Sequence, residues 1–211
     1  MLLLSGSVII GYLLSTVYVR NMLLDKLVED SKKILFYLLV FLSLILFGFY
    51  TYSLISQVNG FNFNTSLSLT LLTINFLFFM FMFTKPIYHL GLVLFPITVF
   101  IILITIFYRT DNAPIGFADN NLQIHILASF TSYGFLGLAG IEAILLFRQE
   151  KKLRHVKDSS LAISLPPIEV MEKVMFDLIV IGFILLTVSL LSGAPFILGD
   201  NNFFLMQKII F

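Results

Sequence analysis

The residue with the clearest potential for chemistry is His125, which lies at the start of the apolar segment 122–147. Ser129, Ser132 and Tyr133 follow it at spacings of four, seven and eight residues, so a helix would carry them on the same face, beneath the histidine. A neutral imidazole can bind a metal, including haem iron, and neighbouring hydroxyls can orient the ring. The alternative is a helix-end histidine that forms hydrogen bonds in the lipid headgroup region.

The other ionisable side chains within apolar segments have simpler explanations. His89 is expected to be an interfacial or packed residue, and Glu142 to pair with, or reach toward, a nearby basic loop. A proton or ion relay is the alternative for Glu142. Asp177 follows Lys173 by four residues, and this spacing predicts a structural cap near the start of a helix.

Composition requires that most of the chain lies in a lipid bilayer. Of the 211 residues, 59% are hydrophobic and only 12% are charged, which is more apolar surface than a soluble domain of this size can bury. Continuous apolar runs favour helices over a β-barrel, whose strands would alternate polar and apolar residues. We therefore predict a single integral-membrane domain over 1–211, an all-α bundle of six spanning helices. The predicted segments are Leu2–Val19, Ile34–Leu54, Leu67–Phe83, Ile87–Tyr108, Leu122–Phe147 and Val170–Leu191.

The basic residues predict the orientation of these helices. Eleven of the 13 lie after the first, third and fifth segments or at the start of the sixth, and only Arg109 and Lys208 fall on the other side. Because basic loops remain in the cytoplasm, the N-terminus and His125 are predicted to lie outside. His89 then lies at the opposite membrane face, so a second axial ligand would be Met206, water or a partner's residue.

Several classes of function are excluded or disfavoured. The chain has no cysteine, which excludes disulfides, cysteine-ligated metal sites and thiol catalysis. Its net charge is +1 with no long basic stripe, so the expected partner is the bilayer and not nucleic acid. No catalytic motif is visible, and we expect no enzymatic activity.

Small residues in the fifth segment indicate close helix packing. Gly134, Gly137, Gly140 and Ala143 recur every third position and would let another helix approach, so this helix is expected to be central. Asn75 in the third segment is expected to form a hydrogen bond to a neighbouring helix.

Two stretches resemble a known family. They are His125–Gly134, which continues toward a basic loop, and Pro167–Ala194, which includes a Leu-Leu-Thr run and ends in Ser-Gly-Ala. Over residues 122–194 they resemble the cytochrome c assembly (CcsA/ResC-type) membrane proteins, specifically the HemX-like and YpjD-like branch. The resemblance implies haem handling at the outer face of the bacterial inner membrane, with His125 as an axial ligand of haem iron.

The chain also departs from that family's pattern. It has no tryptophan, whereas the family carries a tryptophan-rich external WWD motif, and it stops at Phe211, about where that loop should follow. An accessory protein of cytochrome c assembly is therefore expected, with Arg109 and Lys208 as possible contacts of haem propionates. The competing hypotheses are a cofactor-free structural or partner-binding subunit, which would dock through the small residues of the fifth helix, and a small transporter.

Overall fold

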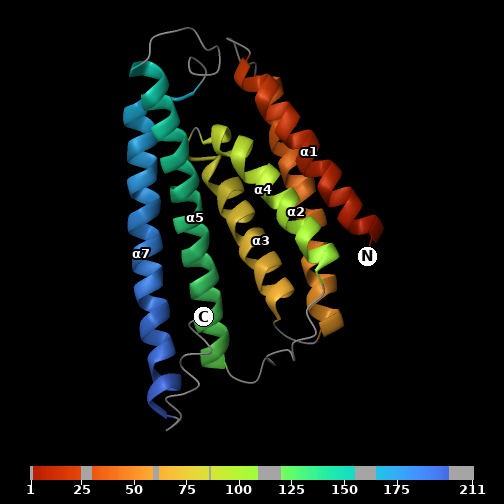
Figure 1. The fold of residues 1–211 in the computed structure, drawn as a ribbon, viewed down its shortest axis with the longest axis vertical. Helices are drawn as coiled ribbons and strands as arrows, with labels where there is room; N and C mark the ends of the chain where they lie inside the picture. The colour runs from red at the N-terminus through yellow and green to blue at the C-terminus, as the bar shows by residue number, and fades with distance from the viewer. Residues whose placement is uncertain are drawn as a thin grey trace.

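The structure is a computed structural model that describes residues 2–24, 30–58, 62–85, 87–108, 120–154 and 165–199. Within these ranges it is helical and contains no strand, which confirms the predicted all-α fold (Figure 1). The elements are α1 (Leu2–Leu24), α2 (Asp30–Val58), α3 (Phe63–Phe81), the 3-10 helix η1 (Tyr88–Leu90), α4 (Gly91–Phe107), α5 (Asn120–Arg154) and α7 (Ile168–Gly199).

Six of these helices are long and apolar enough to span a membrane. A helix satisfies its backbone hydrogen bonds internally, which is what an element surrounded by hydrocarbon requires. α2, α5 and α7 extend beyond the segments predicted from the sequence. The apolar runs mark only the part within hydrocarbon, whereas these helices continue into the more polar residues on either side.

Successive long helices run in alternating directions, so their ends form two groups (Figure 1). One group, which we call the basic end, carries Lys85, Arg148 and Lys173. The other group includes the first turns of α5, and we call it the His125 end. The prediction that the basic end faces the cytoplasm remains a prediction, since the structure contains no membrane.

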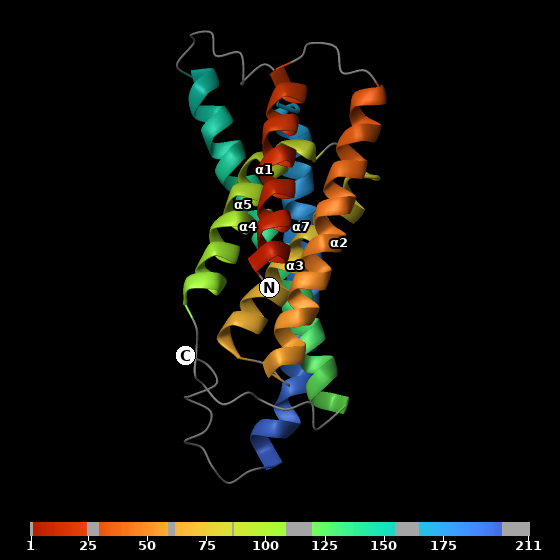
Figure 2. The same cartoon turned by 90° about the vertical axis from the view of Figure 1, so that its right-hand side faces the viewer.

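The helices form two packed parts. α1 to α4 make a four-helix bundle, and α5 lies against α3 on one side of it, with α7 running alongside α5 (Figures 1 and 2). Only 22% of the apolar stretch of α7 is buried inside the molecule, against 44% of the apolar stretch of α5. α5 is thus the central helix of this side, as predicted, and α7 is peripheral.

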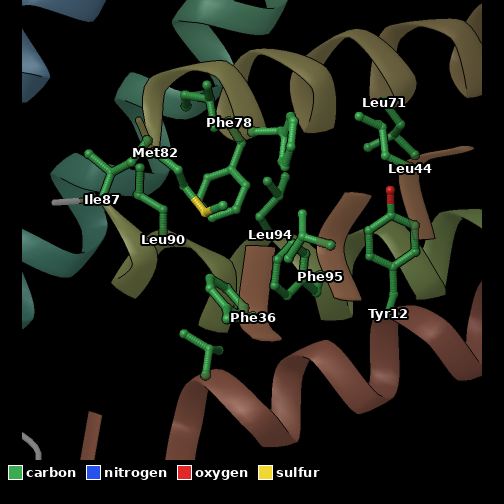
Figure 3. Close-up of a cluster of buried hydrophobic side chains, with 14 of the residues drawn as sticks. Tyr12, Phe36, Leu44, Leu71, Phe78, Met82, Ile87, Leu90, Leu94 and Phe95 are labelled. Carbon is green, nitrogen blue, oxygen red and sulfur yellow. The ribbon is translucent and has the colours of Figure 1, made fainter. Parts of the chain in front are cut away.

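Aromatic rings fill the core of the α1–α4 bundle (Figure 3). Phe36, Phe78 and Phe95 are fully buried, and the ring of Phe95 lies 5.4 Å from that of Phe78 and 6.3 Å from that of Phe36. Other phenylalanines point outward, such as Phe107 and Phe183 with 83% and 65% of their surface exposed. The apolar exterior matches a lipid environment, as expected for these residues.

The small residues of α5 pack against α3 over part of their length. A Cβ added to Gly134 would lie 2.8 Å from Leu77 of α3, and one added to Gly137 would lie 3.3 Å from Ile74. Gly140, in contrast, has no neighbour within 4 Å and is exposed. At Gly134 and Gly137 the face suggested for partner docking is therefore already occupied by α3.

Two polar contacts test predictions about single residues. Asn75 donates a hydrogen bond from Nδ2 to Oγ1 of Thr98 in α4 at 2.9 Å, which confirms its predicted contact with another helix. Asp177 accepts a hydrogen bond from Nζ of Lys85 at 2.5 Å, a partner that the interpretation as a helix cap did not include. Asp177 lies about two and a half turns into α7, beyond the first turn in which a helix dipole acts.

Candidate functional site

His125 lies near the start of α5 and is partly buried against α7. Its Nδ1 atom is 2.7 Å from the backbone carbonyl oxygen of Ser189. A carbonyl oxygen only accepts hydrogen bonds, so Nδ1 must carry the hydrogen and donate it. In the neutral ring Nε2 then carries the lone pair, which is the form of imidazole that binds a metal.

Three small residues of α7, which we call the α7 socket, allow this contact: Ser189, Ser192 and Gly193. A Cβ added to Gly193 would lie 2.7 Å from Cε1 and 2.9 Å from Nδ1 of His125, closer than real side chains approach. The Ser192 hydroxyl donates a hydrogen bond to the same Ser189 carbonyl at 2.8 Å. The socket therefore both makes room for the imidazole and fixes the acceptor that orients it.

The Nε2 atom of His125 has no hydrogen-bond partner among the residues that the structure describes. Within the same residues, no group of three or more His, Asp or Glu side chains could hold a metal ion. The described residues therefore favour a group that brings most of its own ligands, as haem does, over a bare metal ion.

The three residues predicted to support His125 lie at different places. The Ser129 hydroxyl donates to the His125 carbonyl at 2.8 Å and lies 2.5 Å from the Ser189 hydroxyl, so it joins α5 to the socket. Ser132 is buried deeper in the interface and donates to the Gly182 carbonyl at 2.9 Å. Tyr133 is 51% exposed and is not brought to the ring.

The other predicted haem contacts lie outside the described residues. These are Arg109 and Lys208, the possible propionate contacts, and Met206, a candidate second axial ligand. Their roles stay predictions.

A second histidine is paired in the interior. Nε2 of His89 lies 2.8 Å and 3.1 Å from the two carboxyl oxygens of Glu142, and the side chains are 1% and 0% exposed. The expectation that Glu142 reaches toward the basic loop is therefore wrong. Burial among apolar helices makes a nearby imidazole a better partner than a distant loop cation.

The remaining nitrogen of this buried pair is enclosed by the protein. Nδ1 of His89 is buried and has no hydrogen-bond partner among the described residues. The side chain of His89 is 1% exposed, whereas His125 is half-buried, so burial separates the two histidines as candidate ligands.

Sequence reasoning missed the α7 socket and the His89–Glu142 pair. The socket residues belong to the stretch Pro167–Ala194, but nothing in α7 alone shows that Gly193 meets a ring 68 positions earlier. A usable signal existed for the pair. Both side chains were predicted near the same membrane face, and oppositely charged groups inside a membrane tend to pair.

Comparison with known proteins adds the family. A sequence model described as cytochrome C assembly protein matches residues 33–206, which is most of the chain. The chain belongs to the cytochrome c assembly protein family. No curated protein and no solved structure gives a significant match.

The family match extends well beyond the two stretches that carry the resemblance. It begins in α2 and includes the whole α5–α7 contact, whereas the resemblance was strong only over 122–194. Membership supports a role in cytochrome c biogenesis and haem handling for a multi-pass membrane protein. His125, the α7 socket and the His89–Glu142 pair all fall within the matched residues.

Proposed function

We propose that this member of the cytochrome c assembly family is an accessory protein of the bacterial inner membrane that binds haem through Nε2 of His125. The observation that carries the proposal is the hydrogen bond from Nδ1 to the Ser189 carbonyl. It selects the tautomer whose remaining nitrogen can coordinate iron, and the hydrogen bonds of the ring to described residues all use Nδ1.

The α7 socket supports this role by fixing the ring before a ligand arrives. A side chain that is already held in one orientation loses less conformational entropy on binding. The Ser189 carbonyl also polarises the N–H of the imidazole, which makes Nε2 a stronger donor toward a metal. When bound, haem would supply an iron centre with open axial positions, and the protein's part is to hold and orient it.

The distribution of charge favours an external position for this site. His125 lies at the end of the bundle opposite Lys85, Arg148 and Lys173. By the positive-inside rule these residues remain cytoplasmic, so the imidazole would face the compartment in which cytochromes c receive haem. Arg109 and Lys208 are the two of the 13 basic residues predicted to lie on that side, and they could pair with propionates there.

We propose an accessory role and not that of a haem ligase. The described residues at the His125 end offer one imidazole, held by α7, which can hold haem. We propose that the protein stores, delivers or regulates haem beside other membrane proteins of the assembly system and carries out no bond-forming step.

An absorption spectrum of the protein purified in detergent tests this function. We expect a Soret band after expression with ample haem, and we expect His125→Ala to reduce it strongly. His155→Ala is the matched control, since it removes an imidazole from the predicted basic loop and should leave the band unchanged.

Two results would contradict the proposal. One is an absent Soret band in both the unchanged protein and the His125→Ala variant when haem is abundant. The other is a full band in the variant. The first result would favour the cofactor-free subunit, which binds partners and not haem.

A further inference from the structure

The interior of the α1–α4 bundle contains an unusual set of unsatisfied oxygen atoms. Seven buried side-chain polar atoms lack a hydrogen-bond partner within the described residues, and five of them are oxygens on α1, α2 and α3. These five are the hydroxyl oxygens of Tyr12, Thr51 and Ser68 and the amide oxygens of Asn64 and Asn75. Inside a membrane, polar atoms left without partners are costly, so such a set needs an explanation.

Thr51 and Ser68 lack the bond that helical hydroxyls in this chain usually make. Ser43, Thr70 and Thr98, for example, each donate to the backbone carbonyl four residues earlier, at 2.8 or 2.9 Å. That local bond satisfies a buried hydroxyl without any partner from outside the helix. Its absence at Thr51 and Ser68 leaves both hydroxyls available for a partner inside the bundle.

The α3 part of this set lies on one helix face. Asn64, Ser68 and Asn75 are spaced by four and seven residues and therefore lie above one another. Their face is directed at α4, because Nδ2 of Asn64 donates to the Tyr108 carbonyl at 2.6 Å and Nδ2 of Asn75 donates to Thr98. The row runs from the His125 end of the bundle to the middle of α3.

The hydroxyls of α1 and α2 approach the same region. The Tyr12 ring packs against Phe47 of α2 and Phe95 of α4, and its hydroxyl points toward Leu71 (Figure 3). Leu71 lies between Ser68 and Asn75 on α3. Thr51 is one turn beyond Phe47 on α2 and is only 1% exposed.

The row ends abruptly toward the basic end. Beyond Asn75, the interior is filled by the rings of Phe36, Phe78 and Phe95 and by Met82 (Figure 3). These side chains offer no hydrogen-bonding partner, so a polar path from the His125 end would stop at this aromatic cluster.

We propose that internal water molecules occupy the half of the α1–α4 bundle nearer the His125 end, in a file that reaches Asn75 and stops at the aromatic cluster. Water is the ligand that suits these atoms, because they are uncharged, mix acceptors with hydroxyls and come from three helices. A buried water typically makes about three hydrogen bonds, which suits unpaired oxygens that come from three different helices. The file gives this half of the bundle a hydrated interior while the other half stays dry.

Radiolytic footprinting of the full chain in detergent tests the proposal directly. Short X-ray pulses produce hydroxyl radicals from water, and these oxidise side chains that touch a water molecule. Tyr12 is the reporter, and the equally buried Phe36 and Phe78 are matched aromatic controls on the dry side. We expect Tyr12 to be oxidised at least about five times faster than either phenylalanine, since only Tyr12 would contact bound water. Equal rates at the three positions would overturn the proposal.

The substitution Thr51→Val provides a second, independent measurement. Valine has nearly the shape of threonine and removes only the hydroxyl. If Oγ1 binds water, the variant loses a hydrogen bond and its Tm falls by about 2 °C. If the core is dry, the variant removes an unpaired polar atom and its Tm rises, which would contradict the file at this position. Thr98→Val is the control, because it loses its bond with Asn75 and should lower Tm in either case.

Discussion

The two described histidines, His89 and His125, are each held at one ring nitrogen by another helix, yet they are suited to opposite roles. Glu142 of α5 holds Nε2 of His89, and the Ser189 carbonyl of α7 holds Nδ1 of His125. Neither remaining nitrogen has a hydrogen-bond partner among the residues described. The difference lies in how accessible the remaining nitrogen is, because His89 is 1% exposed and His125 is half-buried.

The two imidazoles differ in the surroundings of the remaining nitrogen. Either a carboxylate or a carbonyl can accept from the ring and leave a lone pair on its other nitrogen. Nδ1 of His89 is enclosed in the interior and its side chain is only 1% exposed, so this imidazole is a structural element. The half-buried His125 keeps Nε2 near the end of the bundle, and the comparison teaches that access to this nitrogen, more than the partner that holds the ring, decides whether it can bind haem.

The largest effect is expected from breaking the buried pair. Glu142→Leu leaves His89 without its partner inside the bundle, and the loss of one member of a buried ion pair typically costs about 3–5 kcal/mol of unfolding free energy. His125→Ala removes one neutral, half-buried hydrogen bond and should cost only about 1 kcal/mol. Unfolding of the two variants in detergent, followed by circular dichroism, measures the contrast.

A double variant separates the buried pair from packing. His89→Leu combined with Glu142→Leu replaces both polar groups with apolar ones, and it should recover much of the stability lost in Glu142→Leu alone. The structural role assigned to the pair would be wrong if Glu142→Leu were no more destabilising than His125→Ala.

The second-largest effect is expected at the α7 socket, where a substitution should weaken the affinity for haem. Gly193→Ala places a Cβ where the His125 ring lies, so the imidazole must turn away from the Ser189 carbonyl. Substitution of a group that orients a ligand typically weakens metal binding about 10–100-fold. A haem titration followed at the Soret band measures the loss.

Gly140→Ala is the matched control for the socket. Gly140 has no neighbour within 4 Å, so alanine there should leave haem binding intact and improve the helix by about 1 kcal/mol. Unchanged haem affinity in Gly193→Ala would show that the socket does not orient His125.

The smallest effect is expected at the ion pair of Lys85 and Asp177, which joins the α1–α4 bundle to α7. Lys85 and Asp177 are 30% and 43% exposed, so the surroundings screen their attraction. Lys85→Met should cost less than about 1 kcal/mol of unfolding free energy, and raising the salt concentration should diminish the difference from the unchanged protein. A cost as large as that of Glu142→Leu would mean that burial does not set the contrast between the two pairs.

The sequence predicted well those features that depend only on whether a segment or side chain lies in hydrocarbon or in water. Six spanning helices followed from the apolar runs, because hydropathy reports directly which segments can lie in hydrocarbon. The contact of Asn75 with a neighbouring helix followed for the same reason, since a buried amide must find a partner.

The features that depend on register between helices could not be predicted in the same way. Glu142 and His89 are 53 positions apart, and their contact requires the depth and rotation of α5 relative to η1. The position of Gly193 beneath His125 likewise depends on how α7 lies along α5. Periodicity assigns a residue to a helix face, but it does not say which residue of the next helix lies opposite.

The central claim is that His125 supplies the lone pair that binds haem iron, and imidazole rescue tests it most directly. In His125→Gly the ligand is removed and a space remains against α7, which free imidazole can fill. The account predicts that the variant loses the Soret band of bound haem and regains it when imidazole is added, whereas His155→Gly keeps its band throughout. A His125→Gly variant that binds haem as well as the unchanged protein before imidazole is added would contradict it.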